Sequence, residues 1–398
     1  MLLLLALTVG LAASARSEAK ELPAAAFINF SSSPAAQLAE QLLLGDDDAR
    51  WVEREQLDKV VCEQELNAAF EAGQGQKRVQ LGKLLQAGVL VVVRHHMKPS
   101  PHHEIVVCET KLGLRLLVDS HPATKDAEAD ARNVAASVRN GLQKSREEIV
   151  DICAVPPLVS DNLGFEHDHL RGAFAKVIES AIAQRPGTLL VELAEAQALS
   201  RELDIVDQRA EVKRSKPYYL LGRYRHLEEE GKTKIRLELD LQRGGASLAK
   251  SEAEVVDVDV ADTLRQITFD LTKNLHEAEF DLAGRTAESE MLNARARVFE
   301  TLTNWDEAAA LAEASLLLDA DQQDLRRRCI KIDTKLSGKS YITSVNSVEE
   351  ISAGLRAYAR GVEHLEQFLR KARDIAPYNR FGGGNVIGDL RRGSRGLG

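Results

Sequence analysis

The sequence predicts an α/β (α+β) fold: two tandem, duplicated units with mixed sheets, followed by an all-α helical region. Short apolar runs typical of buried strands alternate with segments whose apolar residues recur at helical spacing. This order occurs before residue 150 and again after it, whereas the chain after Arg285 is compatible with helix almost throughout. Repeated order favours internal duplication. The alternative is two unrelated segments, because strand–helix alternation is common.

The first unit, residues 23–150, opens with a strand and closes with a long helix. Its strands are predicted where apolar residues run between turn residues, at 23–31, 51–52, 88–95, 104–109 and 113–119. Its helices are predicted around Leu38 to Leu43 and at 53–70, 79–86 and 126–145. In the last helix Val134, Val138 and Leu142 lie at i, i+4 and i+8, which places them on one face.

The second unit, residues 151–282, repeats this order more loosely. Strands are predicted at 152–159, 188–192, 218–226, 235–243 and 253–260. Helices are predicted at 167–184, within 190–203, and at 262–277. The charged stretch from Glu228 to Lys232 predicts a hairpin turn. Asp257 and Asp259 alternate along the last strand and are expected on its solvent face, with Asp262 as the N-cap of the next helix.

Residues 285–375 form the predicted helical region, and the Gly/Arg-rich tail 376–398 is predicted to be disordered. Around residues 304–321, small residues alternate with larger apolar ones, as in the second helix of a tetratricopeptide repeat, which this segment resembles. The resemblance implies protein binding, with Trp305, Leu311 and Leu318 as the candidate partner-binding residues. One repeat is fewer than a self-standing solenoid needs, so we expect the region to pack on the preceding unit or on another chain.

The first fifteen residues have the features of a signal peptide. An apolar run from Leu2 to Ala13 is followed by Ala13-Ser14-Ala15, a small-x-small cleavage site. The run is too short to span a bilayer comfortably, and no Cys follows it, so we expect export without a lipid anchor. The positive segment that usually precedes such a run is missing; the alternative is a buried N-terminal helix.

Composition narrows the class of protein further. A net charge of −9 and a pI near 5.7 do not favour a nucleic-acid binder, which normally carries a basic face. The four cysteines, Cys62, Cys108, Cys153 and Cys329, form no CxxC pair. Three of them lie in apolar surroundings, so we expect buried free thiols.

Two separated motifs in the first unit resemble the CsgG family, named for the curli secretion component. The motifs are Val52-Glu53-Arg54 with Leu57-Asp58-Lys59 and Glu63 to Leu66, then Leu81-Gly82-Lys83-Leu84-Leu85 before the strand Val89–Val93. The resemblance covers roughly residues 25–145. It implies a non-enzymatic α/β protein that is either periplasmic or associated with the outer membrane. It does not imply the secretion pore, because residues 89–93 are continuously apolar, as in a buried strand, rather than alternating as in a membrane hairpin.

The densest group of candidate ligands lies in the loop 94–104, RHHMKPSPHHE. His95, His96, His102 and His103 are the kind of side chains that bind zinc, copper or nickel. The corresponding loop of the second unit keeps only His226, which favours a solvated hairpin instead. A His-x-His pair, His167 and His169, opens a predicted helix and is a weaker candidate.

No nucleophile or metalloprotease motif occurs in the sequence, and no cofactor is expected. We therefore expect a non-enzymatic, exported, CsgG-like protein of the cell envelope, periplasmic or secreted. It would act as a scaffold or as an assembly or transport accessory by contacting other envelope proteins, with a homo-oligomer left open. The alternative is a metal-binding or small-ligand-binding protein that uses the histidine loop. Neither nucleic acid nor a membrane-spanning segment beyond the signal peptide is expected.

Overall fold

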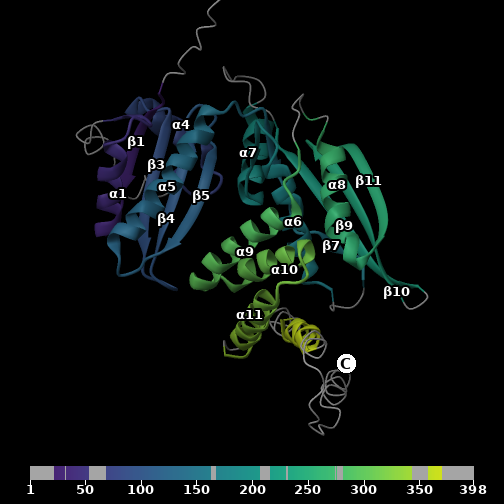
Figure 1. Cartoon of the computed structure of the whole chain (residues 1–398). Helices are drawn as coiled ribbons and strands as arrows, with labels where there is room; N and C mark the ends of the chain where they lie inside the picture. The colour runs from purple at the N-terminus through teal and green to yellow at the C-terminus, as the bar shows by residue number, and fades with distance from the viewer. Residues whose placement is uncertain are drawn as a thin grey trace, which may run out of the picture.

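The computed structural model describes residues 22–31, 33–52, 69–162, 167–206, 216–229, 232–273, 275, 281–342 and 357–369 (Figure 1). The predicted signal peptide (1–15), most of the helix predicted at 53–70 and the tail (376–398) lie outside these residues. The part of the CsgG-like motif between Glu53 and Leu66 lies outside them as well.

The first sheet has five strands in the order β2-β1-β3-β4-β5. The strands are β1 (Ala24–Asn29), β2 (Arg50–Trp51), β3 (Val89–His96), β4 (His102–Glu109) and β5 (Arg115–Pro122). β1 is parallel to β2 and β3, and the β3–β4 and β4–β5 pairs are antiparallel. The sheet is therefore mixed, as predicted.

Helices cover both faces of this sheet. α1 (Pro34–Leu44) and α5 (Ala127–Arg146) pack on one face with Val91 and Val93 of β3. Leu90 and Val92 face the other side, in a core that includes Leu85 of α4 (Gly75–Leu85). A strand that is buried on both faces has no polar positions. This explains the continuously apolar run in β3.

The second sheet repeats the topology of the first. This sheet has six strands. Five of them lie in the order β11-β10-β9-β6-β8, and the sixth, β7, pairs with β9. The strands are β6 (Asp151–Ala154), β7 (Val159–Ser160), β8 (Thr188–Leu190), β9 (Tyr218–Glu229), β10 (Lys232–Arg243) and β11 (Ala246–Val256). β6 is parallel to β8 and β9, and the two following pairs are antiparallel. Read from β8, the order and directions match those of β2-β1-β3-β4-β5, as expected for a duplicated unit.

The helices of the second unit follow the same scheme. α6 (Leu170–Ala183) comes after the first strand, α7 (Leu193–Val206) after β8, and α8 (Val260–Thr272) after the last strand. The positions of α6 and α8 correspond to those of α1 and α5 in the first unit. The fold-class prediction of two α/β units with mixed sheets is therefore confirmed.

The strand predicted at 253–260 is wrong in position. β11 ends at Val256, Asp257–Asp259 is a short 3-10 helix, and Asp259 rather than Asp262 occupies the N-cap of α8. The cause is the tight turn at Gly244 and Gly245, both with positive φ, which returns the chain directly from β10 into β11. Two glycines at these positions are a strong hairpin signal that the apolar pattern alone does not reveal.

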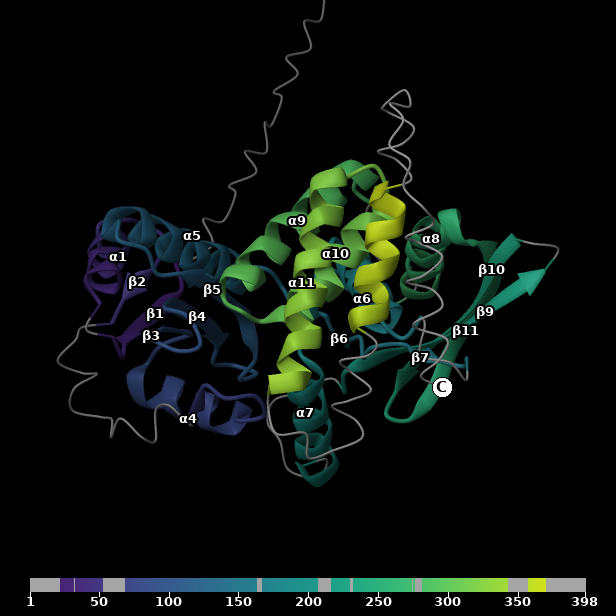
Figure 2. The same cartoon turned by 90° about the horizontal axis from the view of Figure 1, so that it is seen from below.

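The chain continues as a helical region, as predicted. It contains α9 (Arg285–Thr301), α10 (Trp305–Leu318), α11 (Gln323–Ile342) and a further helix at residues 357–369 (Figure 2). Ala308, Ala312 and Ser315 of α10 are almost completely buried, and Ser315 Oγ lies 2.9 Å from Ser289 Oγ of α9. Small side chains allow the close approach of the two helices.

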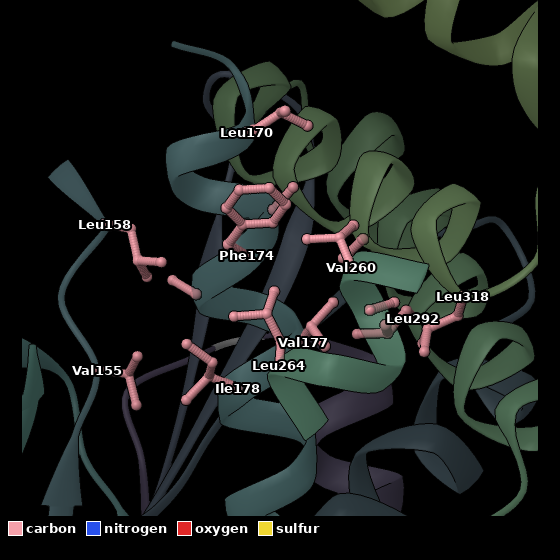
Figure 3. Packing of buried hydrophobic residues seen from close by; sticks show 14 of the residues in the cluster. Val155, Leu158, Leu170, Phe174, Val177, Ile178, Val260, Leu264, Leu292 and Leu318 are labelled. Atoms are coloured by element: carbon pink, nitrogen blue, oxygen red, sulfur yellow. The ribbon is translucent and has the colours of Figure 1, made fainter. Parts of the chain in front are cut away.

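The helical region and the second unit share one hydrophobic core. Phe174 and Ile178 of α6 and Leu264 of α8 belong to the same cluster as Leu292 of α9 and Leu318 of α10 (Figure 3). The helical region thus packs on the preceding unit, which was one of the two expected arrangements. Among the residues that the structure describes, no helix has the length and apolar character to cross a membrane.

Candidate functional site

The four histidines of loop 94–104 lie at the end of the β3–β4 hairpin. His95 is opposite His103, and His96 is opposite His102, with ring centroids 4.9 Å and 4.8 Å apart in stacked pairs. Glu104 accepts a hydrogen bond from Arg94 at 2.9 Å and lies 3.3 Å from Nε2 of His96. Strand register, rather than a shared ligand, explains how these rings come together.

This histidine hairpin does not contain a preformed metal centre. No group of three or more His, Cys, Asp or Glu side chains has a metal-binding arrangement anywhere in the described ranges. His103 is buried, and its burial together with the neighbouring His95 lowers its pKa below the usual range. The structure brings the predicted ligands together in pairs, so metal binding at this hairpin stays a prediction without geometric support.

A serine, a histidine and an aspartate do meet between β5 and α5. Ser137 Oγ donates to Asp119 Oδ2 at 2.6 Å, and His121 Nε2 lies 2.7 Å from the same hydroxyl. In a hydrolytic triad the imidazole lies between the serine and the carboxylate; here the serine contacts the carboxylate directly. Burial raises the pKa of Asp119, but the hydrogen bonds from His121 and Ser137 outweigh it and hold that pKa below its usual value. We interpret this cluster as a link between helix and sheet.

The predicted partner-binding residues lie in the core of the chain. Leu311 and Leu318 are almost completely buried, and Trp305 packs partly buried against the same cluster. α10 lies against α9, α11 and α6, so the chain's own helices occupy the sides that carry Leu311 and Leu318. This corrects the expectation that Leu311 and Leu318 bind a partner, because neither side chain is accessible to one. A partner of the helical region has to bind elsewhere on it.

A buried charge cluster attaches the helix at 357–369 to α10 and α11. His364 Nε2 lies 2.6 Å from Glu313 Oε1, and Arg360 pairs with Asp333. Burial by itself would raise the pKa of Glu313. The nearby His364 lowers this pKa by a larger amount, so the net shift is downward. Burial raises the pKa of Asp333 to about 6 despite Arg360. Sequence reasoning missed this cluster, although polar residues among apolar helix positions were a signal for it.

A second buried charge cluster joins the two α/β units. Arg78 of α4 is completely buried and pairs with Glu195 of α7, while its Nε donates to the carbonyl oxygen of Gly113 at 2.7 Å. Glu195 also accepts from the backbone N–H of Gly73 at 2.7 Å and lies 3.4 Å from Nε of Arg115. One carboxylate thus compensates two guanidinium groups at the junction.

Apolar contacts surround this junction. Leu114 and Leu116 of the first unit share a small cluster with Ile152, Leu189 and Leu199 of the second. The helical region adds a further contact, because the hydroxyl of Ser100 in the histidine hairpin donates to the carbonyl oxygen of Thr301 at 3.0 Å. The two units and the helical region therefore form a continuous body.

The outward side of α11 carries a row of cations, which we call the basic face of α11. It consists of Arg327, Lys331 and Lys335, all exposed and spaced i, i+4, i+8. The Arg327 guanidinium carbon lies 5.0 Å from the ring centroid of Phe368, so the helix at 357–369 borders this face. Arg327 also lies 3.5 Å from the exposed Asp324 of the same helix. In a chain with a net charge of −9, three exposed cations along one side of a helix are nevertheless a local excess of positive charge. It is the candidate partner surface that the geometry favours.

Two partly buried histidines of the second unit, His169 and His226, lead us to expect that the protein loses stability in acid. Burial lowers the pKa of His169 to about 4, and burial together with the adjacent His167 lowers that of His226 to about 3. Both rings are neutral in the folded chain at pH 7, whereas in the unfolded chain they bind protons near pH 6.5. Stability is therefore lost as the pH falls from about 6.5 towards 4. His169 alone accounts for roughly 3 kcal/mol at the acid end.

The measurement compares the wild type with His169→Gln in urea unfolding at pH 7, 5.5 and 4. Between pH 7 and pH 4, the unfolding free energy of the wild type should fall by roughly 3 kcal/mol more than that of the variant. His96→Gln, on the exposed end of the histidine hairpin, is the control and should follow the wild-type profile. Parallel profiles for the wild type and His169→Gln would contradict the assignment.

Comparison with known proteins gives no identification: no protein-family model and no curated protein matches the chain. The resemblance to the CsgG family therefore depends on the residues quoted above. It stays a prediction, together with the function that it implies.

Proposed function

We propose that this chain is an exported, non-enzymatic scaffold of the cell envelope, of CsgG-like type, that acts in assembly or transport by holding other proteins. Support comes from the signal-peptide pattern, from the CsgG-like motifs and from the arrangement of the three parts. We further propose that the basic face of α11 is the partner-binding surface and that it binds an acidic segment of an envelope protein.

The observation that carries this proposal is how the helical region is attached. Its inner helices, α9 and α10, are fixed in the core of the second unit, and α9 also contacts the first unit near Thr301. α11 packs on α10 and holds its cations outward. A surface attached through this shared core and through the contact at Thr301 keeps a fixed position relative to both α/β units, which suits a scaffold.

Deleting the helical region would not test this function. Leu311 and Leu318 complete the core of the second unit, so their removal would expose Leu264 and Ile178 to water. A deletion variant would lose its partners by misfolding, whatever the partner-binding surface is. The test therefore needs the full chain with changes confined to the surface.

The full chain and the triple variant Arg327→Glu, Lys331→Glu, Lys335→Glu serve as baits for cross-linking in envelope extracts. The control is Lys77→Glu, Lys83→Glu, Arg132→Glu, which makes the same charge change at exposed positions of the first unit. We expect the wild type and the control to retain the same acidic partner, and the α11 variant to recover at least tenfold less of it. Added salt should weaken capture, because exposed charges are screened.

Two outcomes would contradict the proposal. Equal recovery by the wild type and the α11 variant would exclude the basic face as the binding surface. A bait recovered from cells with residues 1–15 still attached and in the cytoplasmic fraction would exclude an envelope function. Circular dichroism of all three proteins establishes that each variant is folded.

A further inference from the structure

β11 is the outer strand of the second sheet within the part of the chain that the structure describes (Figure 1). β10 pairs with it on one side. Its core-facing residues Ala249, Ala253 and Val255 are only partly buried against the core. Ile235 and Leu237, which face the same core from β10, are completely buried. An added strand beside β11 would complete the burial of its inner face and satisfy its outer row of backbone groups.

The outer face of β11 carries an ordered set of charges. Lys250, Glu252 and Glu254 alternate with the core-facing residues and are exposed. Glu252 pairs with Arg236 of β10 at 2.9 Å, and Lys250 lies 3.8 Å from Asp240. A neighbouring strand would therefore meet a cation and an anion two positions apart. Such a pattern selects the register of the strand that can pair with it.

A second copy of β11 fits this pattern in one register. A two-fold axis perpendicular to a sheet pairs two identical edge strands antiparallel, and the residue on the axis faces itself. With Ser251 on the axis, Lys250 of each copy faces Glu252 of the other. Moving the axis to residue 250 or 252 places Lys250 or Glu252 opposite itself, and at residue 253 Glu252 faces Glu254. Like charges directly opposite destabilise a pair of strands.

The ends of the strand agree with this register. A β-bulge leaves Leu248 as the extra residue of β11, with its side chain 55% exposed, and Val256 at the other end is 37% exposed. With Ser251 on the axis, Leu248 of one copy faces Glu254 and is the diagonal neighbour of Val256 in the other. Diagonal neighbours lie within reach of large side chains, so both apolar ends gain a contact.

We propose that two copies of this chain associate through β11, antiparallel about a two-fold axis at Ser251, so that their second sheets become one continuous sheet. The scaffold would then present two basic faces of α11. The proposal does not depend on the partner-binding function, because it concerns a different surface. The bulge and the lysine of β11 are also features by which many proteins prevent pairing at a sheet edge. If they serve that purpose here, the chain will be a monomer.

Sedimentation velocity of the full chain over a range of concentrations tests the association. We expect a dimer of the 43.7 kDa chain. Lys250→Glu and Glu252→Lys should each weaken dimerisation about tenfold, because each places like charges opposite at two symmetric positions. The double variant should restore it. Arg225→Glu, exposed on β9 of the same sheet, is the control and should dimerise like the wild type.

Cysteine cross-linking tests the register independently. Opposing residues in antiparallel strands have the Cα separation that a disulfide needs, so Ser251→Cys should give a covalent dimer on mild oxidation. Residue 254 is exposed, but in this register it lies far from residue 254 of the other copy. Glu254→Cys should therefore give no more covalent dimer than the wild type. The proposal would be overturned by a monomer at all concentrations. It would also be overturned if neither charge reversal changed the dissociation constant of the dimer. A failure of the double variant to recover would overturn the register.

Discussion

Glu195→Ala is expected to lower the free energy of unfolding by about 3–5 kcal/mol, the range found when one partner of a buried ion pair is removed. The carboxylate of Glu195 compensates the buried guanidinium groups of Arg78 and Arg115 and accepts a hydrogen bond from Gly73. Without it, two cations lie close together at the junction of the units. Urea unfolding followed by circular dichroism measures the loss.

Glu192→Ala is the matched control for this experiment. Glu192 pairs with the same Arg115 at 3.2 Å, but its side chain is 59% exposed, so water compensates for its loss. We expect a change below about 1 kcal/mol, as for other surface ion pairs. Equal effects of the two substitutions would mean that the junction does not depend on its buried carboxylate.

Leu311→Ala is expected to cost about 2–5 kcal/mol, the range for removing a buried leucine and leaving a cavity. Leu311 is completely buried in the core that joins α10 to the second unit. The effect should therefore extend beyond the helical region. Native-state hydrogen exchange should become faster in β9 and β10, which border this core, and should change little in β3, which lies in separate cores.

Met291→Ala provides the comparison, because Met291 lies on α9 with 46% of its surface exposed. The free energy of unfolding of the Met291→Ala variant should stay within about 0.5 kcal/mol of the wild-type value. If Leu311→Ala accelerated exchange in the helical region alone, the shared core would not be a single cooperative unit.

The sequence predicted the first unit well because its elements have strong periodic signals. Val134, Val138 and Leu142, predicted on one helix face, are all buried in α5. The continuously apolar run at Val89–Val93 correctly indicated a strand buried on both sides. Burial from both faces removes the alternation that a half-buried strand shows, and this is a property that the sequence displays directly.

The contacts that join the parts could not be predicted in the same way. Arg78 and Glu195 lie 117 positions apart, and each is an ordinary charged residue of an amphipathic helix in the sequence. Their pairing depends on how two units pack, which periodicity within one helix does not encode. The same reason explains Leu311 and Leu318: their pattern indicated an apolar helix face, but not whether another chain or the chain itself covers it.

The shared core also has a consequence for the order in which the protein is made on the ribosome. The first unit is closed by α5, which ends at Arg146. The second unit stays open until the helices that cap it, up to Ile332 of α11, have been translated. The first unit can therefore fold early, while the second keeps apolar surface exposed for the time needed to translate about fifty further residues after Ala283, roughly 2.5–10 s at ordinary elongation rates. During synthesis, the second unit is therefore the part of the described chain whose apolar core stays open to water for longer.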